Sequence, residues 1–341
     1  MARFRCPTRV AFWTSATILC IVTAGINALA QYTQTSLVTT TQDPNLVNAW
    51  GLAYGAGGPF WVADEGTGKS TVYDADGTIV PLAVTVPAAQ TGKRGTPTGV
   101  VANSTSGFVV SQNGASGPAA FIFDTLGGTI SGWNSSVNPG TAVIAVNKSA
   151  AANYTGLAIA AMSNGSTFLY AVNHAKNQIE MYSSSFKLVK TFTDSSLTGL
   201  KAYGIQAIKG KLYVAFAGTT GGAVDIFNLS GLLLRKLTSN GSSGPLQDPW
   251  GLALAPGNFG ILSGALLVGN VINGQINAFN VSTGKFVGVL KDTSGKAITN
   301  PGLWALEFGG GGGSSSNGNT NQLFLTVGPA GYSKGLLAVI Q

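Results

Sequence analysis

The stretch DPWGLALAPGNFGILSGALLVGNVINGQINAFNVSTGKFVGVLKD, from Asp248 to Asp292, decides the fold of this chain. It holds four short apolar runs, which are separated by Pro, Gly, Asn and Ser-Thr-Gly breakers. Apolar runs of this length between such breakers are typical of β-strands joined by tight turns. The stretch therefore predicts one four-stranded antiparallel sheet, which is the size of a single blade of a β-propeller.

The same unit repeats along the chain, and two sequence markers identify the repeat. The first is a residue of each innermost strand, at intervals of 47 to 57 residues: Gly51, Gly99, Gly156, Gly204, Gly251 and, in the sixth place, Trp304. The second is an aromatic residue that we assign to the third strand: Tyr73, Phe123, Tyr182, Phe227 and Phe279. Because the two markers keep the same phase, we predict an all-β fold, a six-bladed β-propeller with four-stranded blades.

The sixth repeat lacks an outer strand, because the sequence stops at Gln341 soon after the apolar run GLLAVI. Residues Tyr32–Thr41 are the remaining stretch of high strand propensity, with Leu37 and Val38 among threonines. We predict that this stretch pairs beside Gly335–Ile340, so that the N-terminal strand closes the ring and removes an exposed sheet edge.

Two segments are expected to depart from the regular blade. The second blade is assigned to residues 96–137, with a Gly-rich insertion at 113–118, and residues 138–153 are expected to form an exposed link. The Gly/Ser/Asn tract over 309–321 has the composition of a mobile surface loop.

The first 30 residues have the layout of a secretory signal peptide. Three arginines precede an apolar run over residues 10–22, and Ala28-Leu29-Ala30 offers a small-residue cleavage site. An uncleaved membrane anchor is the alternative, although the run is shorter than the roughly 18 apolar residues that a span needs. We therefore expect a signal peptide over 1–30 and a propeller domain over 31–341, secreted or otherwise extracytoplasmic (in a periplasm or at a cell surface). We expect the mature chain to be a monomer without a transmembrane span.

The composition excludes several classes of function. Both cysteines, Cys6 and Cys20, lie in the expected leader, so the mature domain can form neither a disulfide nor a thiolate metal site. The 19 basic and 12 acidic residues give a net charge of +7, but the basic residues are scattered and form no stripe of the kind that binds nucleic acid. Charged residues make up 9% of the chain, against about 25% in ordinary domains, which suits a turn-rich extracytoplasmic β-protein.

Several whole phrases are similar to those of one known family: DPNLVNAWGLAYG, GPFWVADEGTG, GIQAIKGKLYVAFA, DPWGLALAPGNFG and GLWALEFG. They resemble an uncharacterised family of exported, NHL-like six-bladed β-propeller proteins, bacterial and often surface-sorted, and the resemblance extends from Leu37 to Ile340. It implies the propeller fold and an exported location, and it implies no activity, because none is established for the family. Family members often end with a His-Gly-Leu-Phe-Gly-like segment, whereas this chain has KGLLA at 334–338, so no role of that histidine is carried over.

Three tryptophans that open equivalent inner strands are the candidate ligand residues. Trp50, Trp250 and Trp304 fall in neighbouring blades, while the other three blades carry two threonines and a tyrosine at this place. Asn48 and Asp248 lie at the same end of the inner strands. Aromatic side chains give large contact area with few torsions to freeze, so this sector of the mouth is predicted to bind a sugar (glycan) or a peptide. The alternative is that the rings only pack between blades.

Three polar residues after the second strands are weak metal candidates. Asp64, Asn173 and Asn270 stand in the motifs VAD, VNH and VGN, where such residues also cap the backbone of the following turn. The expected function is a non-catalytic binding or surface-associated module without a cofactor. The alternative is a calcium-dependent, lactonase-like hydrolase or lyase, which would need several oxygen ligands converging on the axis. His174 is the single histidine, so a His-rich zinc site is excluded.

Overall fold

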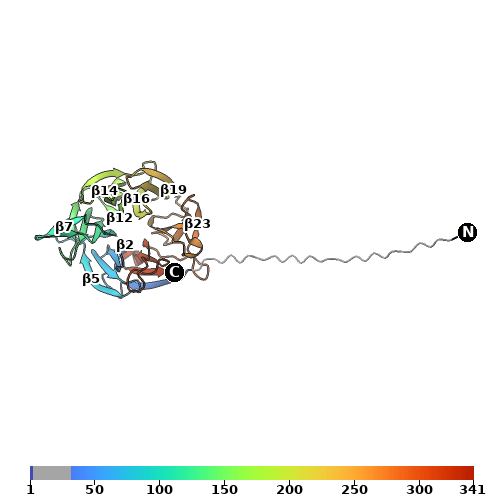
Figure 1. Ribbon diagram of the computed structural model, residues 1–341, viewed down its shortest axis with the longest axis horizontal. Coiled ribbons are helices and arrows are strands. Elements are labelled where there is room, and N and C mark those ends of the chain that lie inside the picture. The colour runs from blue at the N-terminus through green and yellow to red at the C-terminus, as the bar shows by residue number, and fades with distance from the viewer. Residues whose placement is uncertain (3–31) are drawn as a thin grey trace.

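The fold is a ring of six four-stranded antiparallel sheets around a central axis (Figure 1). It is seen in a computed structural model of the chain, which describes residues 1–2 and 32–341. The predicted signal peptide over 1–30 lies outside these residues, apart from its first two. The six-bladed, all-β propeller expected from the repeats is confirmed.

Each blade runs from an inner strand at the axis to an outer strand at the rim. From the axis outward, the strands of blades one to three are β2 (Ala49–Tyr54), β3 (Phe60–Asp64), β4 (Lys69–Tyr73), β5 (Ile79–Thr85); β6 (Pro97–Ala102), β9 (Phe121–Thr125), β10 (Thr129–Trp133), β11 (Val143–Asn147); β12 (Tyr154–Ala161), β13 (Thr167–Asn173), β14 (Gln178–Ser183) and β15 (Leu188–Phe192). Those of blades four to six are β16 (Lys201–Ile208), β17 (Lys211–Gly218), β18 (Gly221–Asn228), β19 (Leu233–Gly241); β20 (Pro249–Leu254), β21 (Ala265–Asn270), β22 (Ile276–Asn280), β23 (Phe286–Val289); β24 (Leu303–Phe308), β25 (Leu323–Val327), β26 (Leu336–Ile340) and β1 (Gln34–Thr39).

Helical structure is almost absent from the described part of the chain. It consists of 3-10 turns at His174–Lys176 and Gly260–Leu262 and of one short turn, α1 (Pro329–Tyr332). None of the helical segments in residues 1–2 and 32–341 combines the length and the apolar character that a membrane span requires.

The N-terminal strand closes the ring in blade six, as predicted. β1 pairs antiparallel with β26, with Gln34 opposite Ile340 and Thr39 opposite Leu336. The side chain of Val38 is fully buried in a cluster that includes Leu337. Segments far apart in sequence thus form one ladder, and the ring cannot open without breaking it.

Blade two differs from the prediction because a hairpin is inserted between its first and second strands. β7 (Val109–Gln112) and β8 (Ala115–Pro118) form a separate two-stranded sheet that projects from the rim at the left of Figure 1. Phe123 therefore lies in the second strand, β9, and not in the third. The stretch 138–153, predicted to be an exposed link, contains the outer strand β11.

The Gly/Ser/Asn tract between β24 and β25, predicted to be a mobile loop, packs against blade one. The carbonyl oxygens of Ser316 and Ser314 accept hydrogen bonds from the amides of Ala75 and Asp76, at 2.9 and 3.0 Å. The side chain of Asn317 is only 1% exposed. Composition could not reveal these contacts, because the partners belong to another blade.

The marker glycines are required by the close approach of neighbouring inner strands. A Cβ on Gly51 would lie 2.5 Å from the carbonyl oxygen of Thr98 in the next blade, and a Cβ on Gly251 would clash with the carbonyl of Trp304. A residue without a side chain is the one that fits such an approach of two backbones. In blade six the pairing register shows that Ala305, rather than Trp304, corresponds to the marker glycines.

Candidate functional site

The three candidate tryptophans meet at the end of the axial channel where the inner strands begin. Trp50 stacks on Trp304 with ring centroids 3.6 Å apart, and Trp250 meets them edge-on at 6.1 and 6.0 Å. Tyr203, at the equivalent position of blade four, packs edge-on against Trp50 and Trp304 at 6.4 and 6.2 Å. These four rings close this end of the channel, and we call them the aromatic plug.

Hydrogen bonds hold two of the three indoles of the aromatic plug in place, whereas Trp50 Nε1 is buried without a partner among the described residues. Trp250 Nε1 donates to the carbonyl oxygen of Thr155 at 2.7 Å, and Trp304 Nε1 donates to Asn48 Oδ1 at 3.0 Å. Trp50, Trp250 and Trp304 are 5%, 9% and 2% exposed. The indoles therefore lie inside the channel. Trp50 and Trp304 stack on each other, and burial leaves none of the three indoles as an open stacking surface.

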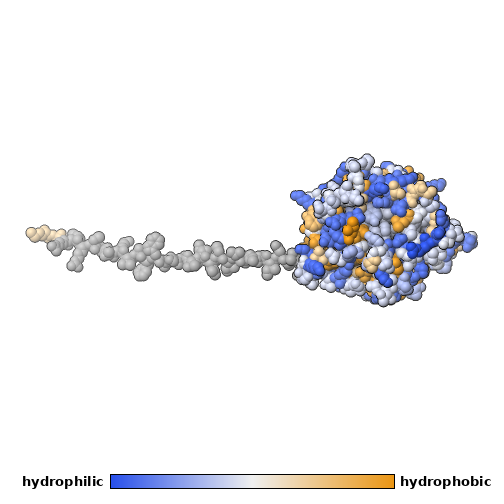
Figure 2. Space-filling view, turned by 180° about the vertical axis from the view of Figure 1, so that it is seen from behind, coloured by the Kyte–Doolittle hydropathy of each residue, from blue (hydrophilic) through white to orange (hydrophobic). Residues whose placement is uncertain are grey.

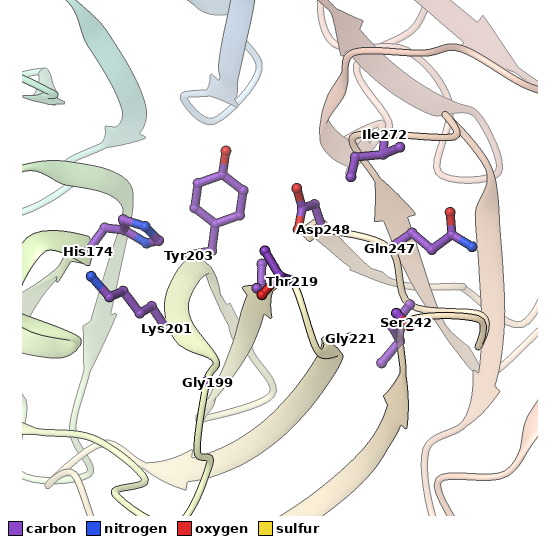
Figure 3. A pocket seen from close by; sticks show the side chains of 13 residues that line it. His174, Gly199, Lys201, Tyr203, Thr219, Gly221, Ser242, Gln247, Asp248 and Ile272 are labelled. Carbon is purple, nitrogen blue, oxygen red and sulfur yellow. The ribbon is translucent and has the colours of Figure 1, made fainter.

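A cavity of about 540 Å³ opens beside the aromatic plug, over blades four and five (Figure 3). Asp248 is the predicted ligand residue that lines it, whereas Asn48 is buried and also donates to a glutamate of its own blade. Figure 3 shows His174 and Lys201 on one side of Tyr203 and Asp248 on the other. The cavity thus brings together side chains from three blades.

The two sides of this cavity differ in charge. Burial raises the pKa of Asp248, and the nearby imidazole of His174 partly opposes that rise. Burial lowers the pKa of His174, and the charge of Lys201 lowers it further, although the hydrogen bond to the Ala202 carbonyl acts in the opposite direction. His174 Nδ1 lies 2.9 Å from that carbonyl oxygen, which can only accept, so Nδ1 carries the hydrogen. A ligand would meet an ammonium and a neutral imidazole on one side and a carboxyl group on the other.

A strained turn places a second tyrosine at this mouth. Ala330, Gly331 and Tyr332 of α1 have φ values of 53°, 62° and 67°, and this left-handed conformation costs a non-glycine residue roughly 1–2 kcal/mol. Tyr332 is 46% exposed, and its ring centroid lies 5.8 Å from that of Trp304. Burial and then the charge of Asp248 raise the pKa of Tyr332, which indicates that the phenol and the carboxylate are close. Local strain of this kind is often retained at ligand sites.

The three weak metal candidates are hydrogen-bonded within separate blades. Asn173 Oδ1 accepts backbone amides at 3.3 and 3.4 Å, and Asn270 Oδ1 accepts the amide of Gln247 at 2.9 Å. Asp64 Oδ2 accepts the hydroxyl of Thr71 at 2.8 Å. Across residues 32–341, no group of three His, Cys, Asp or Glu side chains is arranged to hold a metal ion. The contacts of the two asparagines are those of turn caps, whereas Asp64 Oδ1 is buried without a hydrogen-bond partner among the described residues.

Asn173 also belongs to a buried network around Glu180 in blade three. Its Nδ2 donates to Glu180 Oε1 at 2.9 Å, while Lys148 Nζ, Tyr154 OH and Tyr182 OH donate to Oε2 at 2.9, 2.8 and 2.6 Å. Burial alone would raise the pKa of Glu180, but these hydrogen bonds outweigh it and lower the pKa to about 2. The carboxylate is therefore ionised and fully satisfied, which is a structural role.

Fold and site together define a six-bladed β-propeller whose channel is closed at one end and bordered there by a cavity with charged side chains. Its structure is similar to that of a streptogramin B lyase, with a TM-score of 0.55 and 11% identity over 91% of this chain and 97% of the lyase chain. It is also similar to a chain of a nidogen–laminin complex, with a TM-score of 0.50 and 15% identity over 76% of this chain and 82% of the other. At such identities the likeness shows the fold alone, which enzymes and binding proteins share.

The chain belongs to the family of R648, an uncharacterised protein of Acanthamoeba polyphaga mimivirus. The two sequences are 30% identical over an alignment of 287 positions, which covers 77% of this chain and 69% of the viral protein. No protein-family model matches the chain. Because the relative is itself uncharacterised, membership assigns no activity, and the bacterial, exported character expected from the sequence stays a prediction.

Sequence reasoning did not identify the other side chains at this mouth. Tyr203 had a usable signal, because it stands in the repeat where Trp50 stands in blade one. Lys201 and Tyr332 gave no such signal in the sequence. They lie at the start of β16 and at the end of α1, and the positions of these segments beside the channel depend on how the blades assemble into a ring. Ligand binding at the five predicted residues itself stays a prediction.

Proposed function

We propose that this protein is a non-catalytic binding module whose cavity beside the aromatic plug takes a short peptide segment. The observation that carries the proposal is the cavity of about 540 Å³ between Lys201 and Asp248. Its volume is within the range of small-ligand sites, roughly 300–1,000 Å³. Side chains of opposite charge at its two sides suit a ligand that presents both a carboxylate and an ammonium group.

A peptide fits the open groups better than a sugar does. Sugar rings need free aromatic faces, and the indole faces of the aromatic plug are covered. The groups that stay accessible are Tyr203, Tyr332 and Asp248, which suit an ammonium or a guanidinium group through cation–π attraction and a charged hydrogen bond. A glycan is the competing outcome of the test below.

A calcium-dependent hydrolase or lyase has less support. Calcium takes six to eight oxygen ligands, roughly, and usually several carboxylates. The side-chain oxygens of Asn173 and Asn270 already accept backbone amides in different blades. The proposal therefore involves no cofactor.

The proposal includes export and a monomeric state. The signal-peptide layout of residues 1–30 supports export, and N-terminal sequencing of secreted protein tests it: cleavage after Ala30 is expected, and an intact leader would contradict it. On the face shown in Figure 2, hydrophobic residues occur in separate patches among hydrophilic ones, which favours a monomer.

The ligand class is tested by applying the purified protein to a random pentapeptide array and to a glycan array. Saturable binding to pentapeptides with a free or lysine-borne ammonium group is expected. Asp248→Asn should weaken that binding about tenfold or more, because a hydrogen bond to a charged group is lost.

Asp76→Asn is the matched control, because Asp76 lies exposed in the β4–β5 turn. It should leave the affinity for the same pentapeptide unchanged. Binding to glycans alone, or equal affinity of the Asp248→Asn variant, would contradict the peptide proposal.

A further inference from the structure

The axial channel opens at the end opposite the aromatic plug, where the inner strands finish. A cavity of about 190 Å³ at this end, which we call the far mouth, is lined by residues of five blades. A space of about 30 Å³ continues along the axis and reaches Trp250. The channel is therefore a blind pocket, open at the far mouth and closed by the indoles.

One charged side chain lines this pocket. Glu307 of β24 borders both spaces, and its polar neighbours there are Gln206 and Tyr54. Gln206 Nε2 donates to Glu307 Oε2 at 3.0 Å. Within the part of the chain that the structure describes, Glu307 has no cationic partner.

Lys209 lines an adjoining space of about 290 Å³ that Glu307 also borders, but no ion pair joins the two described side chains. Burial raises the pKa of Glu307 to about 7, although the hydrogen bond from Gln206 opposes this rise. Burial, followed by the charge of Glu307, raises the pKa of Tyr54 to about 12. A buried carboxylate without a paired counterion is costly, so a cation placed beside it would be bound favourably.

We propose that the far mouth binds a small organic cation, namely a primary ammonium with a short apolar chain. An ammonium has three donors, and the pocket offers three kinds of acceptor: the Glu307 carboxylate, Gln206 Oε1 and the Tyr54 hydroxyl. Apolar residues that also line the far mouth, such as Val101 and Ala158, suit the short hydrocarbon chain of such a ligand.

A divalent metal ion fits this mouth less well. Calcium takes roughly six to eight oxygen ligands at 2.3–2.6 Å, and usually more than one carboxylate. Glu307 is the single carboxylate among the lining residues. The far mouth is also separated from the peptide cavity by the aromatic plug, so the two proposals can fail independently.

The test uses n-butylammonium chloride as the probe, with the melting temperature and titration calorimetry as readouts. A saturable rise in melting temperature is expected for the unmodified protein, and none with 1-butanol or with sodium chloride at equal ionic strength. Glu307→Gln should weaken binding at least tenfold, because it keeps the shape and one oxygen acceptor but removes the charge. Asp76→Asn, at an exposed carboxylate that lines neither cavity, should bind the probe as the unmodified protein does.

The pH dependence of the unmodified protein gives a second readout that needs no variant. With the pKa of Glu307 at about 7, binding should be about tenfold weaker at about pH 6 than at about pH 8, since only the ionised carboxylate attracts the cation. Absence of saturable binding, equal binding by Glu307→Gln, or displacement of the probe by calcium would overturn the proposal.

Discussion

The ring depends, at the scale of single residues, on how closely its inner strands approach one another. Glycines at the axis let one strand pass within backbone contact of the next, as Gly51 does against Thr98. The same convergence brings the residue before each marker into the channel, where three tryptophans and Tyr203 pack together. The close approach of the inner strands therefore explains both the glycines at the axis and the packed aromatic rings that close this end of the channel.

Gly51→Ala should lower the free energy of unfolding by about 1–3 kcal/mol, because the added Cβ would meet a carbonyl oxygen at 2.5 Å. Urea unfolding measures this change. Gly257→Ala is the control, because a Cβ there has no atom within 4 Å, and it should be close to neutral. Equal stability of the two variants would show that the inner strands are less tightly packed than described.

The fold is completed, at the scale of strands, by the pairing of β1 with β26. The pairing of β1 with β26 is irregular between Ser36 and Val38, and there Ser36 is exposed while Val38 is buried. The buried Val38 ties the strand to blade six.

Val38→Asp should lower the melting temperature by several degrees, because it buries a charge where β1 packs in blade six and closes the ring. Ser36→Asp, at an exposed position of the same strand, should change it little. Differential scanning calorimetry compares the two variants. A small effect of Val38→Asp would mean that β1 does not hold the ring closed.

Strand order and closure could be predicted because they follow from repeated local patterns. Hydrophobic alternation indicates where a strand lies, but it does not give the position of that strand within its blade. The inserted hairpin of β7 and β8 precedes β9, so Phe123 lies in the second strand of blade two and not in the predicted third strand. The site was less predictable, because burial of an indole depends on partners from other blades. Repeat register could have pointed to Glu307, which corresponds to Gln206 two places after the marker position.

Several carboxyl groups of the whole molecule have shifted pKa values, and the shifts run in opposite directions. Burial, then the charge of Asp194, raises the pKa of Asp225 to about 7. A raised pKa contributes stability that is present below the unfolded value of about 3.9 and is lost as the pH rises through about 7. The lowered pKa of Glu180, about 2, contributes stability above about 4.3 that is lost as the pH falls through about 2.

These opposite shifts predict maximum stability on the acid side of neutral, at about pH 5. Asp225→Asn should reduce the decline between about pH 5 and about pH 8, by an amount on the order of 1–4 kcal/mol. Denaturant midpoints measured across this range test it. A maximum at about pH 8, or an unchanged decline in the variant, would contradict this assignment.

The central claim is that the cavity between Lys201 and Asp248 is the ligand site of this propeller. Hydrogen–deuterium exchange with and without the strongest-binding pentapeptide of the array tests it most directly. Protection of the cavity-lining segments 199–203, 217–221 and 242–248 is expected, with the far mouth unchanged. Protection confined to residues around Glu307, or to the outer strands, would contradict it.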